Sequence, residues 1–428
     1  MTATVFSRPP LREVAVTGIG MVSPLGLDGV STWEGLLEGR SGIGPITRFD
    51  TAGLAATIAG EVRGFRPEDY LPRKEARRTP LFMAYAVAAA RMALEDAALG
   101  EELSRDGRTG VYVGCGIGGL EVMEENFRIM AERGPGRVSP FLIPHFIGNM
   151  AGGMVAMHLG LRGANLTFAT ACAAGAHAVG EAFRRVRDGY ADVMLAGGSE
   201  AVVTRTCLAG FAAMKALSTR NDAPEAASRP FDKDRDGFVV GEGACFLVLE
   251  NLDKARARGA RIYARIRGYD SGCDAYHITA PEPEGAGMAA CMTGALLDGG
   301  LAPETVGWVN AHGTGTPLND VCETRAIREV FGEHAQTLAV SAVKSMTGHL
   351  LGAAGAFAAG VSALGLFHGI LPPTRNLDHP DPACDLDYIP KKARKRAVEA
   401  ALTNAFGFGG TNASLLMTAD SGTERDPT

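Results

Sequence analysis

The sequence predicts an α/β fold, because short strand-like segments alternate with helical segments along the whole chain. The composition is that of a globular protein: 46% of the residues are hydrophobic and 21% are charged, which excludes a disordered chain. Gly is abundant, at 56 of 428 residues, but it has no three-residue period, which excludes collagen. So much Gly indicates many tight turns and close backbone approaches.

The expected strands are rich in the β-branched and aromatic residues that favour a pleated conformation. They cover 13–17, 109–113, 165–169, 191–196, 245–250, 306–310, 339–341 and 413–417. Gly18 and Gly20 are expected to close the first strand. An Ala-rich segment with few helix breakers, 81–99, predicts a long helix, and a second helix is expected over 173–188.

One theme occurs twice, which suggests a duplicated fold. At 170–175 and again at 346–352, a short strand ends in a turn of small residues that carries a reactive side chain, and a buried helix follows. The predicted halves are 12–260 and 261–418, with the boundary near 259–267. The polar tail, 419–428, is expected to be frayed.

Charge and cysteine usage exclude several classes of protein. With 42 basic and 48 acidic residues the net charge is −6, which gives no reason to expect nucleic-acid binding. The eight cysteines are scattered and form no CxxC, so we expect a reducing cytoplasm rather than a disulfide framework or a zinc site. The first ten residues hold no apolar run suited to a signal peptide.

An uncharged stretch, 350–367, is 18 residues long, the nominal length of a membrane span. Six of these residues are Ala and four are Gly, so the stretch is only weakly apolar. We therefore expect a helix buried on all sides in a large core, and no membrane association.

Two motif-like strings do not hold up. The segment 114–119 matches GxGxxG after a strand, but no acidic residue lies near Ser139, where a dinucleotide site needs one. A tight turn that lines a pocket is the better interpretation. The segment 232–237 resembles the start of a calcium loop, but position 243 is Gly rather than Glu. The sequence thus predicts no metal and no nucleotide cofactor.

Cys172 is the candidate nucleophile. It lies in the string ATACAAG, between a predicted strand and a predicted helix. The positive end of a helix dipole favours a thiolate there, and the small neighbours let a substrate approach closely. Most of the other seven cysteines are interpreted as structural.

Two histidines and a glycine-rich segment complete the candidate site. His312 lies in NAHGTGTP and His349 in KSMTGH, each in a turn that follows a strand. Because strand ends of an α/β sheet gather at one face, these side chains are expected to converge with Cys172. The segment 404–412 has two aromatics and three glycines, and it is expected to be a mobile gate whose backbone N–H groups can point at an oxyanion.

These four strings, in this order, resemble the β-ketoacyl-acyl carrier protein synthases, from about 14 to 417. Within that family the chain is most similar to the bacterial elongating type, synthase II. The resemblance implies a thiolase fold, in which duplicated βα halves form a five-layered α-β-α-β-α sandwich, and it implies a homodimer. The chemistry that the resemblance implies needs no metal or organic cofactor.

The resemblance also implies a decarboxylative Claisen condensation in two half-reactions. Cys172 would take the acyl group, while the N–H groups of Cys172 and Phe408 bind the oxyanion. His312 and His349 would then stabilise the enolate formed when malonyl-acyl carrier protein loses carbon dioxide. Lys344, with Glu323, would hold the charge network and orient His349.

The substrate and partner contacts come from the same resemblance. Thr314 and Thr316 would bind the pantetheine chain. Ile117 and Phe211 would line the acyl pocket, with Leu142 added from the partner subunit. The predicted substrate-binding set is Thr314, Thr316, Ile117, Phe211, Leu142 and Glu323. An acidic acyl carrier protein would dock on basic residues, namely Lys74, Arg77, Arg78, Arg137 and Lys215.

Other functions stay open at this point. A ketosynthase of a polyketide or another secondary pathway has the same motifs. A non-catalytic partner subunit of a ketosynthase pair typically lacks the nucleophile, which is present here as Cys172. A thiolase would need a second active-site cysteine late in the chain, and none follows Cys384. A nicotinamide oxidoreductase has only the GxGxxG string in its favour.

Overall fold

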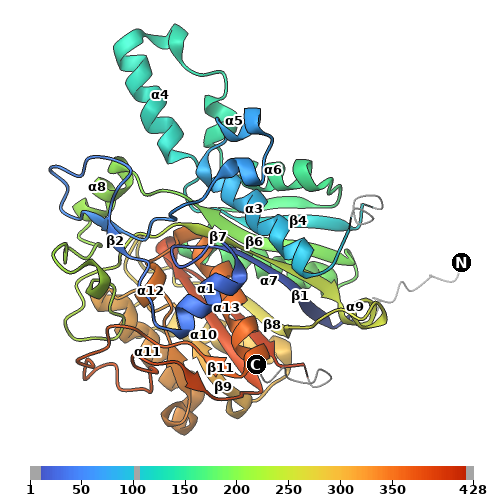
Figure 1. Ribbon diagram of the computed structural model, residues 1–428. Helices are drawn as coiled ribbons and strands as arrows, with labels where there is room; N and C mark the ends of the chain where they lie inside the picture. Colours follow the sequence, from blue (N-terminus) through green and yellow to red (C-terminus); the bar gives the residue numbers. More distant parts are fainter. Residues whose placement is uncertain (1–10, 101–106, 421–428) are drawn as a thin grey trace, which may run out of the picture.

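The computed structural model describes residues 11–100 and 107–420, and within them the expected α/β fold is confirmed (Figure 1). Ten strands form one sheet in the order β10-β9-β13-β14-β8-β1-β7-β6-β4-β5. They are β1 (Val14–Val22), β4 (Thr109–Gly114), β5 (Asn165–Phe168), β6 (Val193–Glu200), β7 (Gly243–Asn251), β8 (Ala264–Cys273), β9 (Val306–Asn310), β10 (Ala339–Ser341), β13 (Ala400–Gly407) and β14 (Thr411–Thr418). Two small sheets pair β2 (Gly44–Pro45) with β3 (Ile58–Ala59), and β11 (Ile370–Leu371) with β12 (Arg394–Lys395).

The sheet is built from two halves with the same topology. In the order β5-β4-β6-β7-β1, the first two pairings are parallel and the next two antiparallel. The order β10-β9-β13-β14-β8 repeats this pattern. Three residues of β1 pair with β8 and join the halves. The duplication suspected from the repeated turns is therefore present in the strand order.

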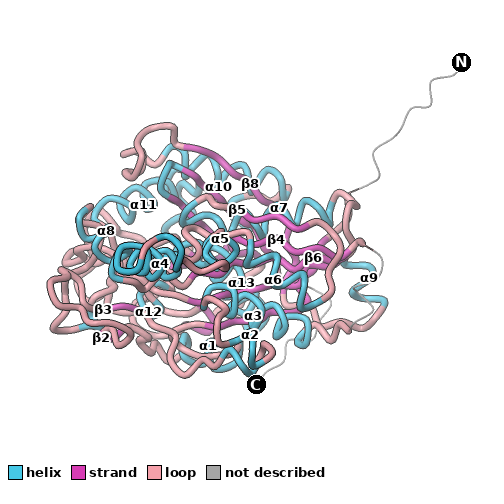
Figure 2. Tube along the Cα trace, turned by 90° about the horizontal axis from the view of Figure 1, so that it is seen from above, coloured by secondary structure: helices cyan, strands magenta, loops and turns pink. Residues whose placement is uncertain are grey.

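The helices make three layers around the two half-sheets, as Figures 1 and 2 show. The longer ones are α3 (Leu81–Asp96), α4 (Leu120–Arg133), α6 (Met150–Leu159), α7 (Ala174–Arg187), α10 (Ala286–Gly299), α11 (Pro317–Phe331) and α13 (Ala354–His368). Shorter ones are α1 (Gly29–Leu37), α2 (Arg73–Ala76), α5 (Leu142–Phe146), α8 (Arg205–Ala213), α9 (Leu252–Ala257) and α12 (Lys344–Thr347). Helix α3 packs on the first half-sheet and α10 on the second, while α7 and α13 contact both. This is the expected five-layered arrangement.

The two central helices occupy equivalent places, as the repeated turns predicted. Helix α7 follows β5 and α13 follows β10. A Cβ on Gly175 would lie 2.7 Å from the Ala356 nitrogen, and one on Gly355 would lie 2.5 Å from the Ala176 nitrogen. The helices thus cross at their starts with backbones in contact. The residue equivalent to Cys172 is Gly352, three positions after His349.

The prediction that Gly18 and Gly20 close the first strand is wrong. Strand β1 continues through Gly18 and Gly20 to Val22, with a bulge at Val16 and Gly18. These glycines serve close packing instead of chain reversal: a Cβ on Gly18 would lie 2.1 Å from the Ala93 oxygen of α3. The Ala-rich face of α3 can therefore lie directly on the strand.

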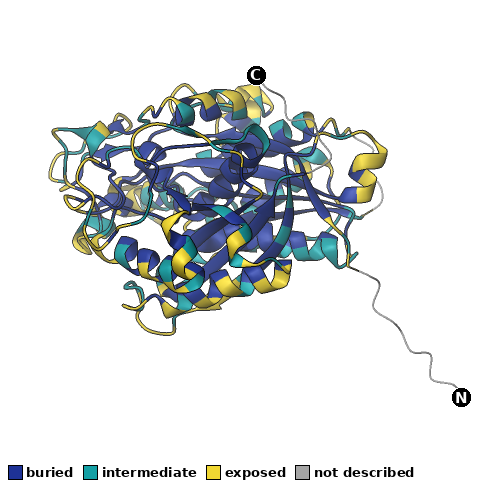
Figure 3. Ribbon diagram, turned by 90° about the horizontal axis from the view of Figure 1, so that it is seen from below, coloured by how far each residue is buried: buried dark blue, intermediate teal, exposed yellow. Residues whose placement is uncertain are grey.

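The apolar segment 351–368 is the one helix in the described residues that is long and apolar enough to cross a membrane. Within the protein 89% of it is buried, in the layer between the half-sheets. Figure 3 shows this centre as buried, with exposed residues on the outer helices. The expectation of a core helix is confirmed, because small side chains let α13 pack against strands on both sides.

Two strands of the ten-stranded sheet were missed, and two segments were wrongly predicted to be irregular. Strand β8 begins inside the predicted boundary region, and β13 and β14 together occupy most of the segment expected to be a gate. Only Phe408–Gly410 connects β13 to β14, so the gate is the tip of a hairpin. At the C-terminus, Ala419 bonds to Glu399 and Asp420 pairs with Arg256, so these two residues are not frayed. The rest of the predicted tail, 421–428, lies outside the described residues.

Candidate active site

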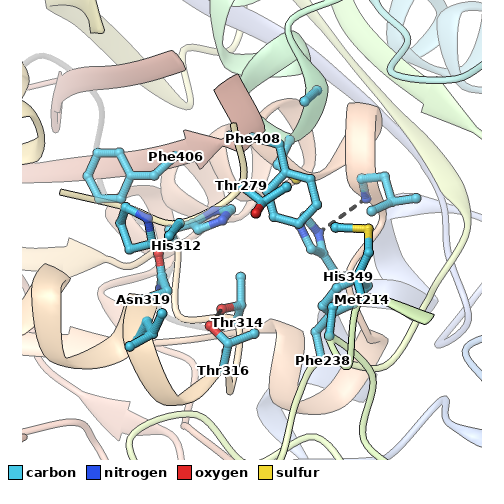
Figure 4. A pocket seen from close by; sticks show the side chains of 18 of the residues that line it. Met214, Phe238, Thr279, His312, Thr314, Thr316, Asn319, His349, Phe406 and Phe408 are labelled. Carbon is cyan, nitrogen blue, oxygen red and sulfur yellow. Dashed lines mark hydrogen bonds between the residues drawn. The ribbon is translucent and has the colours of Figure 1, made fainter. Parts of the chain in front are cut away.

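A cavity of about 850 Å³ brings together the side chains that the strand-end turns carry (Figure 4). Cys172, His312 and His349 all line it, as expected from their positions after parallel strands. The lining also includes Thr314, Thr316, Ile117, Phe211, Phe408 and Lys215 from the predicted set.

Cys172 sits in a sharp turn between β5 and α7. Ala171, just before it, has φ of 48°, an uncommon conformation for a residue with a side chain. The turn tips the thiol toward the cavity at the start of the helix. Burial raises the pKa of the Cys172 thiol to about 11, although the Lys344 charge and the N–H groups of Phe408 and Cys172 pull it down. Desolvation therefore opposes the thiolate that the helix dipole and the cation favour.

The two imidazoles face each other, with ring centroids 5.4 Å apart and planes at 81°. Burial and the nearby Lys344 charge hold the pKa of both His312 and His349 well below the ordinary value, so both rings are neutral. Nδ1 of His349 accepts a hydrogen bond from the Leu351 N–H at 3.2 Å, which assigns the ring proton to Nε2. That Nε2 has no partner among the described residues. It is a free donor at the cavity.

Lys344 and Glu323 hold the turn of His312, not that of His349. The Lys344 ammonium donates to the His312 carbonyl oxygen. Burial lowers the pKa of Lys344 to about 8, against the pull of nearby acidic charges. The Glu323 carboxylate accepts the N–H groups of His312 and Gly313, both at 2.8 Å. Glu323 therefore lies behind the turn and outside the cavity lining, which corrects its place in the substrate-binding set.

The mouth and the inner wall of the cavity have different characters. Near the mouth, the hydroxyl oxygens of Thr314 and Thr316 lie 2.9 Å apart. On the inner wall the rings of Phe211 and Phe408 are 6.4 Å apart, beside Ile117. Leu142 begins α5 and does not line the cavity of its own chain, so its role depends on a second copy.

Glu200, at the end of β6, was missed. It is fully buried, and its carboxylate accepts backbone N–H groups of Gly116 at 2.7 Å, Gly118 at 2.9 Å and Gly352 at 3.0 Å. The GxGxxG turn therefore binds an internal carboxylate rather than a phosphate, and it lines the cavity as predicted. The available signal was an acidic residue at the end of a buried strand.

The predicted docking residues are exposed. Lys74, Arg77 and Arg78, called the basic patch from here on, surround the end of α2. They form no ion pair with any described residue, and the Arg78 guanidinium lies 4.8 Å from the centre of the Phe141 ring. Arg137 is exposed beyond α4, and Lys215 adopts φ of 54° at the cavity mouth.

The segment 232–237, which resembles the start of a calcium loop, forms a hydrogen-bonded turn. Asp232 is buried and accepts bonds from Arg229 and from the backbone N–H groups of Asp234, Asp378 and His379. Asp232, Asp234 and His379 place ligand atoms within 4.8 Å of one another, but the last two are exposed and pair with each other.

Comparison with known proteins is consistent with this geometry. The family models of the β-ketoacyl synthase N-terminal and C-terminal domains match residues 11–255 and 263–378. The chain is 52% identical over 407 residues to the 3-oxoacyl-[acyl-carrier-protein] synthase 2 of Synechocystis sp., covering 95% of this chain and 98% of that one. The corresponding protein of Coxiella burnetii is 49% identical over 406 residues, with the same coverage.

Solved structures give the same result. A β-ketoacyl synthase from Burkholderia phymatum is 37% identical with a TM-score of 0.89, covering 96% of this chain and all of that one. A type II PKS ketosynthase structure that includes its acyl-carrier protein is 34% identical with a TM-score of 0.89 and the same coverage. Fold, cavity and relatives agree: this chain belongs to the β-ketoacyl synthase family.

Proposed function

We propose that the chain catalyses the condensation of an acyl thioester with malonyl-acyl carrier protein in fatty acid elongation. The products are carbon dioxide and a 3-oxoacyl-acyl carrier protein two carbons longer. The observation that carries this proposal is the convergence of Cys172, His312 and His349 on one cavity. The name shared by the relatives at 52% and 49% identity supports the carrier-bound substrate.

In the first half-reaction, the sulfur of Cys172 attacks the thioester carbonyl of the acyl-carrier substrate. The N–H groups of Cys172 and Phe408 would bind the oxyanion, as their contact with the Cys172 sulfur supports. The carbon–sulfur bond to the carrier breaks, and the thiol proton ends on the carrier's sulfur. Because the thiolate is the attacking form, the thiol must lose its proton as the substrate enters.

In the second half-reaction, malonyl-carrier protein loses carbon dioxide and leaves an enolate. His349 would donate its free Nε2–H to the enolate oxygen, and His312 lies across from it. Neutral rings suit this role, because they donate hydrogen bonds without supplying a proton that would quench the carbanion. The carbanion then attacks the acyl-Cys172 carbonyl and releases the Cys172 sulfur, which water reprotonates.

Binding of the substrate would be shared between the cavity and the surface. Thr314 and Thr316 lie where a pantetheine chain would pass toward Cys172. The basic patch, with Arg137 and Lys215, would attract an acidic acyl carrier protein. Lys344 and Glu323 are positioning residues for His312, through the backbone of its turn.

A homodimer is part of this proposal. Among the described residues, strand β5 pairs only with β4 and forms one edge of the sheet, where Leu166 is 53% exposed. Ile143 and Met157 add exposed apolar area from α5 and α6 beside it. An exposed edge strand with apolar neighbours favours pairing with a second copy. That copy would bring its own Leu142 to the acyl pocket. A cytoplasmic location is supported by the eight free thiols.

A polyketide ketosynthase is the second candidate, because a type II PKS ketosynthase shares the fold over 96% of this chain. The same cavity would serve either pathway. A non-catalytic partner subunit is not favoured, since Cys172 occupies a fully formed turn at the cavity.

The decisive experiment is mass spectrometry of the intact chain after incubation with acyl-carrier protein. We expect an acyl adduct on Cys172 that disappears when malonyl-carrier protein is added, with a 3-oxoacyl product. The Cys172→Ala variant should form no adduct. An adduct elsewhere, or none in the wild-type chain, would refute the proposal. Testing polyketide-type extension of the same product separates the two pathways.

A further inference from the structure

The two halves of the fold contain the same sharp turn, but only one turn carries a nucleophile. Ala171 precedes Cys172 with φ of 48°, and Leu351 precedes Gly352 with the same φ of 48°. A one-turn 3-10 helix and then a long helix follow in both cases. Non-glycine residues rarely adopt this conformation, so its repetition shows that the Gly352 turn has the backbone of the Cys172 turn without its thiol.

Glu200 occupies the Gly352 turn. One oxygen, Oε2, accepts the N–H groups of Gly116 and Gly352, and Oε1 accepts that of Gly118. The Ile117 N–H lies 3.2 Å and 3.3 Å from the two oxygens. No described basic side chain forms an ion pair with this carboxylate. Backbone N–H groups, with the Cys115 thiol at 3.7 Å, therefore replace its water.

These bonds connect two walls of the cavity. Ile117 lines it from one side, and Leu351 lines it from the other. Leu351 also donates the N–H that fixes the ring proton of His349. A Cβ on Gly352 would lie 2.2 Å from the Gly116 nitrogen and 2.5 Å from Oε2 of Glu200. The Ile117 loop and the turn after His349 therefore touch directly, and the carboxylate is bonded to both.

We propose that Glu200 is a positioning residue that clamps the Ile117 loop to the turn after His349. With the backbone of Ile117 fixed, only its side chain can yield to a growing acyl chain, which sharpens the choice of chain length. With the Gly352 turn fixed, Nε2–H of His349 keeps its aim at the thioester oxygen. Glu200 transfers no proton and touches no substrate. This inference rests on the proposed condensation.

Two substitutions loosen the clamp in different ways. Glu200→Gln leaves one acceptor oxygen and turns an NH₂ group toward N–H donors, so several of the four backbone groups lose their partner. Glu200→Asp keeps the charge but shortens the side chain, so it cannot reach both the Ile117 loop and Gly352. Both changes should free the two cavity walls from each other.

The matched control is Glu250→Gln. Glu250 is also a buried carboxylate, on the neighbouring strand β7, but it bonds to Thr17 and Arg258 and does not line the cavity. It reports what the loss of a buried carboxylate does to the fold alone. Thermal unfolding of all three variants shows which of them can be compared.

The experiment measures two quantities on each folded variant: malonyl-carrier decarboxylation, and kcat/KM for acyl-carrier substrates of increasing chain length. We expect both Glu200 variants to lose decarboxylation by at least about tenfold. We also expect the ratio of long-chain to short-chain kcat/KM to move by at least about tenfold, with kcat changing more than KM. Glu250→Gln should change neither quantity.

Variants of Glu200 that match Glu250→Gln in both quantities would overturn the inference. So would loss of the folded state in both Glu200 variants while Glu250→Gln stays folded, because Glu200 would then be only structural. If Glu200→Gln alone unfolds, Glu200→Asp decides. A wild-type chain that forms no acyl-Cys172 would instead refute the proposed function, a separate outcome.

Discussion

Cys172 should rest as a neutral thiol and react only through a small thiolate fraction, and this can be tested directly. With its pKa at about 11, about one part in a thousand is thiolate at pH 8. An ordinary cysteine, with a pKa near 8.5, is about one quarter thiolate at the same pH. Because a more basic thiolate is also about tenfold more nucleophilic, alkylation of Cys172 by iodoacetamide should be about 20-fold slower than that of an unperturbed thiol.

The shape of the pH profile carries more information than the rate. The charge of Lys344 lowers the pKa of Cys172, and the pKa of Lys344 is itself about 8. Below pH 8 the ammonium supports the thiolate, and above pH 8 that support is lost. The rate should rise about tenfold per pH unit up to 7 and less steeply across pH 8. Lys344→Met should react more slowly at pH 7 and show no such inflection.

The measurement is the loss of the unmodified Cys172 peptide by mass spectrometry at each pH, which separates it from the exposed thiol of Cys273. Cys172→Ala gives the background. A rate that is constant between pH 6 and 8 would mean a preformed thiolate. The argument that desolvation outweighs the helix dipole would then be wrong.

Three further outcomes are expected. His312→Ala or His349→Ala should reduce malonyl decarboxylation by at least about 100-fold while Cys172 acylation survives in part, and a variant with unchanged decarboxylation would make that histidine structural. Replacing the three residues of the basic patch with Glu should raise KM for carrier substrates about tenfold and weaken the salt dependence of that KM. Turnover of a small thioester mimic should be nearly unaffected. Equal losses for both substrates would mark the patch as structural. Ile117→Phe should shorten the longest accepted acyl chain. The value of kcat/KM should fall about fourfold for each methylene that can no longer be buried. An unchanged chain-length profile would place Ile117 outside the pocket.

The parts of the site that could be predicted are the residues that lie in short sequence motifs. Cys172, His312 and His349 each lie just after a strand, and the topology of an α/β sheet brings such positions together. The duplication was visible for the same reason, since each half repeats a strand, a turn of small residues and a buried helix. The exact equivalence of the two turns was not predicted. The reactive residue of the second turn is His349, whereas the position equivalent to Cys172 is Gly352.

The rest depends on contacts between distant segments. Glu200 bonds to residues 82 to 152 positions away, and no local pattern relates them. The raised pKa of Cys172 has the same origin, because the amount of apolar protein around a thiol is set by tertiary packing. The gate was misjudged because glycines at 407, 409 and 410 suggest a loop, whereas pairing with β14 makes most of the segment a strand.

Two buried acidic groups beside the cavity, Glu323 and Glu200, bond to backbone N–H groups and do not line the cavity. Glu323 binds the N–H groups of the His312 turn, and Glu200 binds those of the Ile117 loop. Neither carboxylate lines the cavity, so a malonyl carboxylate in the proposed reaction would not meet either of them. Burial keeps both imidazoles uncharged. The Lys344 ammonium lies behind the His312 turn, where it donates to the His312 carbonyl oxygen. In the proposed condensation, the enolate that forms on loss of carbon dioxide would meet fixed donors that need no reorganisation, which is how a preorganised site lowers this barrier.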